Sequence, residues 1–259
     1  MNKLIKQLKA MGLTHQDKVL IHSSLKAINR DAILVIESLI DYFNEGMVLL
    51  PTHSWSTMTQ ENNVFDPKTE PSCVGLLTNL FRVRQGVKRS LHPTHSIAGF
   101  GKDVDKFLDL DLNDINTPCH PNGTWGNLGT IGTKILLIGT DMKRNTFVHA
   151  IEEMANIEDR FTKEMIEFEL VTDEGIIRRS YYKHEHPVYQ GLSNNYKIAE
   201  QPLIDLGIII KHKFGDAEVL MMDAMALQKQ ILTWLKINPK LFDTHLPMDE
   251  ELAKIKYQD

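Results

Sequence analysis

The sequence has few cysteines: Cys73 and Cys119 are the only two among 259 residues. Two cysteines cannot build a disulfide framework or a four-cysteine zinc site, and such sparse usage is typical of the reducing cytoplasm. The sequence also has no run of about 18 apolar residues, the length that a membrane-spanning helix needs. We therefore expect a cytoplasmic protein with no membrane partner.

An excess of basic residues is missing as well. The 29 Lys and Arg residues stand against 34 Asp and Glu residues, and the formal charge at pH 7 is −5. Because proteins that bind nucleic acid carry a basic patch or stripe, nucleic acid is not an expected partner. A mildly acidic protein is better suited to a cationic small molecule.

What the sequence does contain is an alternation of apolar strands and helices. Residues 17–25 and 47–52 predict buried strands, and Asp31 is a favourable N-cap for the helix between them. This order indicates a parallel crossover. Residues 133–140, TKILLIGT, predict a third strand that is buried on both faces. The pattern indicates one α/β domain over residues 1–259, with a mixed, largely parallel central sheet flanked by helices.

The pattern changes after residue 160. Two segments of strand-forming residues flank Asp173, Glu174 and Gly175, which together are a hairpin signal. The tail from residue 196 predicts two more short strands and a long helix. We therefore expect residues 161–259 to add an antiparallel C-terminal extension with a helical part.

The segment NTFVHAIEE, residues 145–153, follows the third strand and predicts a helix start. His149 and Glu152 are three residues apart, so on a helix they share a face. A carboxylate partner would fix the imidazole tautomer and leave the second nitrogen free to accept a proton near neutral pH. Taken alone, the motif favours the simpler alternative, a buried helix start with an incidental histidine.

A serine-rich turn follows the first strand. His22, Ser23 and Ser24 lie where the strand turns towards a helix, and backbone N–H groups and hydroxyls there suit phosphate or carbonyl oxygens. The segment lacks the glycines of a P-loop. A turn whose hydroxyls bond their own backbone would have the same sequence.

A second polar segment carries two adjacent cations. Lys88 and Arg89 lie close to Ser90, His92 and Ser96 in the sequence. Arginine supplies a planar donor fork and lysine a point charge, so the group suits a polyphosphate. A solvated basic turn is the alternative that the segment alone slightly favours.

Metal chemistry is less well supported by the sequence. His92 and His95 are three residues apart, and His184 and His186 would lie on one face of a strand. Neither pair has a third ligand at the spacing that a zinc site requires. We expect no metal, and a metal-dependent hydrolase built on these four histidines is kept as an alternative.

Taken in order, several segments resemble the aminoglycoside 3-N-acetyltransferase family, also called the antibiotic N-acetyltransferases. They are VLIHSSLKAI at residues 19–28, the stretch 65–101 that contains KRSLHPTHS, and the stretch 117–153 that ends in NTFVHAIEE. The spacing between them is shared too. The resemblance covers residues 1–160 closely and the remainder loosely.

The resemblance implies that acetyl-CoA donates an acetyl group to a primary amine of an amino sugar or aminoglycoside. It implies His149 as the base and Glu152 as the residue that orients the base or the amine, with residues 1–160 as the CoA-binding and catalytic core. The serine turn would line the pantetheine and pyrophosphate, and residues 88–96 would complete the slot. The implied cofactor-binding residues are His22, Ser23, Ser24, Leu25, Lys88, Arg89, Ser90, His92 and Ser96.

This chemistry agrees with the residue types. An imidazole can take the proton that an ammonium must lose before it attacks a thioester, and backbone N–H groups near the serine turn are candidate oxyanion donors. Acidic side chains would recruit a cationic acceptor. The residues expected to bind the acceptor are Asp66, Glu70, Thr146 and Glu185.

The sequence departs from the family pattern in its expected acceptor region. Family members that act on antibiotics commonly carry a glycine-rich insert after the serine turn, where this chain has only NRDA at residues 29–32. A Cys-Asp pair of the family is also missing. We therefore expect that the natural acceptor is a different amine, such as a nucleotide-linked or polymer-bound amino sugar. The expected oligomeric state is a monomer or homodimer. A CoA-binding protein without efficient acetylation is the other alternative.

Overall fold

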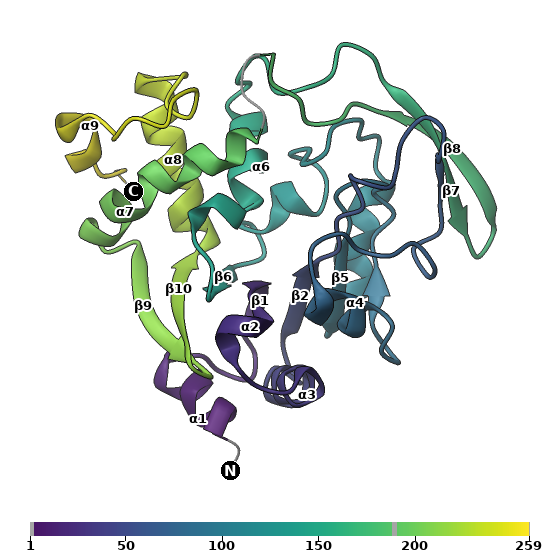
Figure 1. The fold of residues 1–259 in the computed structure, drawn as a ribbon, viewed down its shortest axis with the longest axis horizontal. Helices are drawn as coiled ribbons and strands as arrows, with labels where there is room; N and C mark the ends of the chain where they lie inside the picture. Colours follow the sequence, from purple (N-terminus) through teal and green to yellow (C-terminus); the bar gives the residue numbers. More distant parts are fainter. Residues whose placement is uncertain (1–2, 188–190, 259) are drawn as a thin grey trace.

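The computed structural model describes residues 3–187 and 191–258 (Figure 1). Its centre is a seven-stranded sheet in the order β4-β5-β2-β1-β6-β10-β9. The middle of the sheet is parallel: β1 (Lys18–Ser23) pairs with β2 (Met47–Pro51) on one side and with β6 (Thr133–Ile138) on the other. The side chains that follow these three strands therefore meet at the carboxyl ends of the strands.

The outer strands are antiparallel. β5 (Ile97–Gly101) pairs with β2 and with β4 (Lys88–Arg89), and β10 (Ala217–Asp223) pairs with β6 and with β9 (Ile209–Phe214). The expected mixed α/β sheet is confirmed, but the parallel part is smaller than expected. Sequence-adjacent strands joined by short turns, as β9 and β10 are, can only pair antiparallel.

One face of the sheet is covered by α1 (Lys3–Ala10), α3 (Ala32–Tyr42) and α4 (Leu76–Arg82). Val19 of β1 points into this layer, since it belongs to the same buried apolar cluster as these helices. The predicted N-cap of α3 is confirmed, because Asp31 accepts a hydrogen bond from the backbone N–H of the third residue beyond it at 2.9 Å.

The opposite face is covered by α5 (Val104–Leu108), α6 (Phe147–Met154) and α8 (Ala224–Ile237). Leu20 points into this second cluster, so successive residues of β1 serve opposite cores. Strands in the middle of such a sheet are apolar on both faces, which explains the continuous apolar run of β6.

A smaller sheet lies beside the main one and contains β3 (Val64–Phe65), β7 (Ile166–Thr172) and β8 (Gly175–Tyr181). The predicted hairpin is confirmed: β7 and β8 pair antiparallel in the register that sets Thr172 opposite Gly175. Gly175 has a φ of 133°, which a residue with a side chain rarely adopts.

The remaining elements are short helices. They are α2 (Leu25–Ile28), η1 (Asp109–Leu112), η2 (Trp125–Asn127), η3 (Met142–Arg144), η4 (Leu192–Ala199), α7 (Glu200–Asp205) and α9 (Glu250–Lys254). Among the described residues, none of the helices combines the length and apolar character that crossing a bilayer requires.

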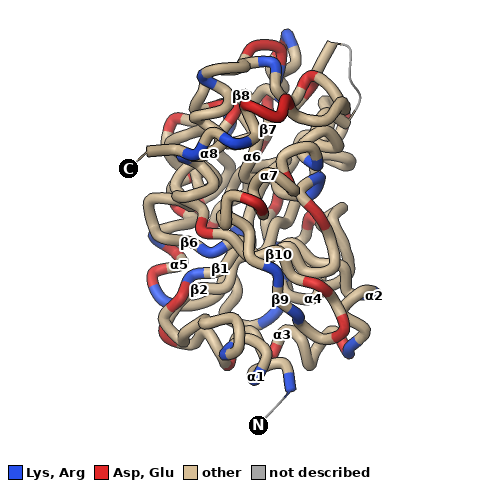
Figure 2. The backbone as a smooth tube through the Cα atoms, turned by 90° about the vertical axis from the view of Figure 1, so that its left-hand side faces the viewer, with Lys and Arg blue, Asp and Glu red and all other residues tan. Residues whose placement is uncertain are grey.

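The C-terminal part of the chain is not separate from the N-terminal part. β10 lies next to β6 in the main sheet, and α8 packs in the same buried cluster as Leu20 and Leu49. In the view of Figure 2, basic and acidic positions are interspersed along the backbone, and the formal charge of the whole chain is −5. The C-terminal part also contributes residues to the cavity at the carboxyl ends of the parallel strands.

Candidate active site

A cavity of about 1110 Å³ lies where the three parallel strands end. Its lining includes His22 and Ser23 at the end of β1, His53 just after β2, and Thr140 just after β6. In open α/β sheets, ligands bind at the carboxyl ends of the strands. The cavity therefore lies where ligands of open α/β proteins bind.

His149 on α6 lines this cavity and contacts a residue from the C-terminal part of the chain. Its Nδ1 lies 2.7 Å from the hydroxyl of Tyr196 in η4. The carboxylate of Glu152 is one helical turn away, but its nearest oxygen is 3.7 Å from Nδ1, too far for a hydrogen bond. Tyr196 therefore connects the two residues: its hydroxyl donates a hydrogen bond to Glu152 and also contacts His149.

The hydrogen-bond network determines which nitrogen of His149 carries the proton. The hydroxyl of Tyr196 has one hydrogen, and it donates that hydrogen to Glu152. Nδ1 of His149 must then donate to the Tyr196 oxygen, and it carries the proton. Nε2 is left with its lone pair free on the cavity side, which is the form that a general base requires.

Glu152 is held in place by Arg160. Nε of Arg160 donates to Glu152 at 2.8 Å, and its terminal nitrogen donates to Asp243 at 2.7 Å. Only 1% of Glu152 is exposed. Burial raises the pKa of Glu152, while Arg160 and Tyr196 act in the opposite direction. The carboxylate is thus a fixed anchor beneath the histidine rather than a ligand of the cavity.

His149 is neutral at physiological pH. Burial lowers its pKa well below the usual value, and electrostatic interactions with His184 and with the guanidinium of Arg160 lower it further. The ring of His184 stacks on that of His149, with 4.1 Å between centroids and 24° between planes. A neutral imidazole with a free Nε2 can accept a proton from a ligand.

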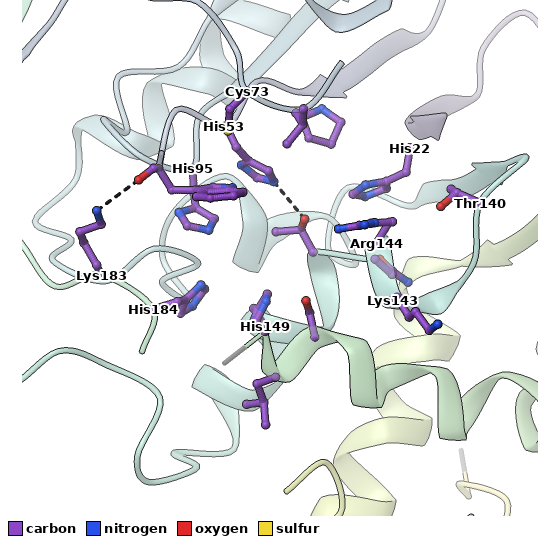
Figure 3. Close-up of a pocket in the computed structure, with 18 of the residues that line it drawn as sticks. His22, His53, Cys73, His95, Thr140, Lys143, Arg144, His149, Lys183 and His184 are labelled. Atoms are coloured by element: carbon purple, nitrogen blue, oxygen red, sulfur yellow. Dashed lines mark hydrogen bonds between the residues drawn. The ribbon is translucent and has the colours of Figure 1, made fainter. Parts of the chain in front are cut away.

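More imidazoles line the same cavity (Figure 3). Burial lowers the pKa of His22 and of His184 to about 3, and it lowers the pKa values of His53 and His95 well below the usual value. Among the described residues, Nε2 of His22 and the Nδ1 atoms of His53 and His184 are buried and have no hydrogen-bond partner. Unsatisfied buried polar atoms are rare, so these nitrogens indicate places where a ligand or water binds.

Two cations lie at one end of the cavity. Figure 3 shows Lys143 and Arg144 on the same side as His22 and Thr140, with His149 between them and Lys183. Within the part of the chain that the structure describes, neither Lys143 nor Arg144 takes part in an ion pair. Their charges are therefore available to an anionic ligand.

The model of one protein family, described as aminoglycoside 3-N-acetyltransferase, matches residues 20–236 of this chain. The chain belongs to that family. The resemblance seen in the sequence motifs is confirmed, and the chain is a divergent member of a family of acyltransferases.

Curated relatives of this chain are little more than a quarter identical to it over the aligned residues. The SPbeta prophage-derived aminoglycoside N(3')-acetyltransferase-like protein YokD of Bacillus subtilis is 28% identical over 173 residues, which are 58% of this chain and 63% of YokD. Aminoglycoside N(3)-acetyltransferase IV of Salmonella sp is 27% identical over 190 residues, 71% of this chain and 69% of that enzyme. The chain thus aligns with less than two thirds of the length of YokD.

Solved structures share the fold of this chain. AAC-IIIb in a binary complex with CoASH has a TM-score of 0.78 at 20% identity, over 90% of this chain and 95% of that one. The apoenzyme of aminoglycoside acetyltransferase AAC(3)-IVa has a TM-score of 0.75 at 23% identity, over 93% and 89% of the two chains. The mixed α/β fold is therefore that of the acetyltransferase family.

In the serine turn of this chain, three of the four predicted cofactor-binding residues line the cavity. His22, Ser23 and Ser24 line the cavity, and the hydroxyl of Ser24 also caps α2 by accepting from the backbone N–H of Ala27 at 3.3 Å. Leu25 is not among the lining residues, because its side chain packs against the apolar cluster under α1 and α3.

The segment from residue 88 to residue 96 contacts the cavity through His95. None of its five predicted cofactor-binding residues is part of the lining. Arg89 donates to the backbone carbonyl of Thr52 at 2.7 Å and to the hydroxyl of Ser96 at 2.9 Å, and its other contacts hold the loop around Pro67. Arg89 is thus a structural clamp, since a guanidinium fork binds backbone carbonyls as well as phosphates. Cofactor binding by Lys88, Arg89, Ser90, His92 and Ser96 stays a prediction that the cavity lining does not support.

The other members of this segment have structural contacts as well. Lys88 is exposed on the edge strand β4 and lies 3.9 Å from Asp105. Ser90 accepts from the backbone N–H of Ile97 at 3.1 Å. His92 is buried, and its Nδ1 accepts from the backbone N–H of His95 at 3.0 Å.

The predicted acceptor-binding residues divide into two groups. Thr146 and Glu185 line the cavity, and the hydroxyl of Thr146 lies 3.0 Å from Nε2 of His53. Asp66 and Glu70 do not line it. Asp66 accepts from a backbone N–H of its own turn at 2.8 Å, and Glu70 accepts from a threonine hydroxyl at 2.5 Å, so both serve the loop that follows β2.

A group of possible metal ligands adjoins the cavity. Cys119, Glu153 and His184 each offer an atom within 4.8 Å of the others. Glu153 accepts from the backbone N–H of Cys119 at 2.8 Å and lies 3.3 Å from Nε2 of His184. Burial raises the pKa of the Cys119 thiol well above its usual value, which disfavours the thiolate that a metal needs. Among the described residues, the histidine pairs of the hydrolase alternative do not assemble as a ligand set.

Proposed function

We propose that this protein transfers the acetyl group of acetyl-CoA to a primary amine of an amino sugar, with His149 as the general base. The observation that carries the proposal is the chain of hydrogen bonds from Glu152 through Tyr196 to Nδ1 of His149. It leaves a neutral imidazole with a free Nε2 in a large cavity, at the edge of the sheet where ligands of α/β proteins bind.

The residues of the site support direct transfer without a covalent enzyme intermediate. Acetyl-CoA supplies an acetyl group activated as a thioester. His149 accepts a proton from the acceptor ammonium at Nε2, and the freed nitrogen lone pair forms the C–N bond while the C–S bond breaks. His149 can then return the proton to the departing sulfur, and the nitrogen loses its second proton to water as the amide forms. Cys119 is not a competing nucleophile, because it is fully buried and its pKa is raised.

The other end of the cavity suits the phosphates of CoA. Lys143 and Arg144 supply positive charge there, on the side of His22 (Figure 3), and Ser23 and Ser24, which follow His22 in the chain, add hydroxyl groups to the lining. Phosphate oxygens are bound well by lysine and especially by arginine, whose planar fork can make two parallel hydrogen bonds. We infer that these residues hold the nucleotide end and direct the thioester towards His149.

The test is the release of free thiol from acetyl-CoA by the purified protein in the presence of a panel of primary amines. His149→Gln should lower the rate by at least ~100-fold, the low end of general-base effects, while CoA still binds in a calorimetric titration. The exposed His245→Gln is the matched control and should keep the wild-type rate. Retention of the rate in His149→Gln overturns the assignment of the base, and CoA binding without thiol release for any amine favours a non-catalytic CoA-binding protein.

A further inference from the structure

The two ends of the cavity differ in what they can bind. Figure 3 places Lys143 and Arg144 at one end and Lys183 at the other, with His149 between them. If the first two cations bind the phosphates of CoA, as the proposed function has it, the acceptor amine approaches His149 from the end near Lys183. The groups at that end therefore decide which amine is used.

The acceptor end carries little negative charge. Of the described residues that line the cavity, Glu185 is the only one with a carboxylate, and residues 188–190 are uncharged in the sequence. Arg160, which also lines the cavity, is paired with Glu152 and Asp243. A polycationic aminoglycoside would meet one exposed carboxylate and the ammonium of Lys183, and like charges at close range repel.

The rest of the acceptor end is made of neutral hydrogen-bonding groups. His95 and His184 are held neutral by burial, so they add no negative charge. A neutral imidazole offers one donor and one acceptor nitrogen, and Nδ1 of His184 has no partner among the described residues. Such groups suit the hydroxyls of a sugar ring, which both donate and accept hydrogen bonds.

Lys183 has one donor to spare for the ligand. Its Nζ donates to the backbone carbonyls of Trp55 and Met58, both at 3.2 Å. An ammonium group has three N–H donors, so one remains. Lys183 lines the cavity and the two carbonyls fix its position, so an anionic group in the cavity can pair with it without a search over rotamers.

We propose that the acceptor is a sugar with a single amino group and an anionic phosphate, and that polycationic aminoglycosides are poor substrates. The phosphate pairs with Lys183, the hydroxyls bond to the imidazole wall, and the amine lies against Nε2 of His149. This inference rests on the proposed acetyl transfer and names its substrate class.

The first test compares kcat/KM for four amines at saturating acetyl-CoA: a hexosamine, its 6-phosphate, a nucleotide-linked amino sugar and kanamycin. One of the two phosphorylated acceptors should exceed both the plain hexosamine and kanamycin by at least tenfold, and the better of the two identifies the source of the phosphate. Equal or better use of kanamycin or of the plain hexosamine overturns the inference while acetyl transfer stands. No thiol release with any amine overturns the proposed function and this inference with it.

The second test separates the charge of Lys183 from its structural contacts. In Lys183→Gln the amide can still donate to the two carbonyls, but the positive charge is lost. The KM of the phosphorylated acceptor should rise at least tenfold, while kcat and the KM of the plain hexosamine stay unchanged. The exposed Lys163→Gln on the nearby loop is the matched control and should alter neither KM. An equal rise in both KM values for Lys183→Gln would mean a structural role only and would overturn the inference.

Discussion

The hydroxyl of Tyr196 lies 2.7 Å from Nδ1 of His149. The two residues come from different parts of the chain, α6 and η4, and they meet beneath the cavity. Because Tyr196 gives its own hydrogen to Glu152, it can only accept from the histidine. One hydroxyl thus sets the tautomer of the candidate base and connects that base to a buried carboxylate.

Removal of the Tyr196 hydroxyl should impair the base without affecting the cofactor site. In Tyr196→Phe we expect kcat to fall roughly 10- to 100-fold, the loss typical when an outer hydrogen-bond partner of a functional histidine is removed. The KM for acetyl-CoA should not change, because Tyr196 does not line the cavity. Tyr257→Phe serves as the matched control. A purely structural effect would appear instead as a lower free energy of unfolding with kcat preserved in the folded fraction.

The activity should persist to lower pH than an ordinary histidine would allow. The neutral form of His149 is the active one, and its protonation at low pH stops the reaction. Because burial lowers the pKa of His149, the acid limb of kcat/KM should have its midpoint below about 6.5, the value of an unperturbed histidine. A midpoint at or above that value would contradict the assignment of His149.

A second variant tests the cause of that shift. Burial is the first cause of the lowered pKa of His149, and the stacked ring of His184 covers part of the imidazole. His184→Ala removes that ring and admits water beside His149, so the acid limb should move towards higher pH. An unchanged limb would show that the stacked ring, 4.1 Å away, does not influence the base.

Arg160 should be important for stability because it neutralises a buried charge. Arg160→Met leaves the carboxylate of Glu152 without its ion pair, and an uncompensated buried charge costs about 3–5 kcal/mol. We expect a loss of that order in the free energy of unfolding, measured by urea denaturation at pH 7.5. The double variant Glu152→Gln/Arg160→Met should recover most of it, since the charge is then absent. No recovery would mean that Arg160 acts through Asp243 or through packing instead.

Arg144 should contribute to the affinity for the nucleotide end of CoA. A charge-assisted hydrogen bond contributes about 1.5–3 kcal/mol, so Arg144→Gln should raise the KM of acetyl-CoA roughly tenfold or more with little change in kcat. With S-acetylpantetheine, which has no phosphates, wild type and variant should have the same KM. Lys9→Gln on the exposed side of α1 is the control. Equal effects on both donors would place Arg144 elsewhere in the mechanism.

Strand order made much of the site predictable from sequence. The sequence predicted three apolar strands and a parallel crossover, and parallel strands bring the residues at their carboxyl ends together, as His22, Ser23 and His149 are in one cavity. His53 was missed, although it follows β2 by the same rule and its position after an apolar run was a usable signal.

Other parts of the site depend on contacts that local sequence does not encode. Tyr196 reaches His149 only because η4 packs beside η3, and no spacing in the sequence indicates that approach. Arg89 illustrates a second limit of prediction from sequence. Its charge is evident in the sequence, but whether a guanidinium binds a phosphate or backbone carbonyls depends on what the fold places within its reach.

The position of β10 in the sheet has a consequence for synthesis of the protein on the ribosome. β6 pairs with β1 along one edge, and its other edge is covered only by β10, Ala217–Asp223. Until those residues have been translated, the Ile- and Leu-rich β6 has an open edge to which another nascent chain can pair. A pause in translation between β6 and β10 should therefore promote aggregation. A chaperone that binds the unpaired edge of β6 should prevent it.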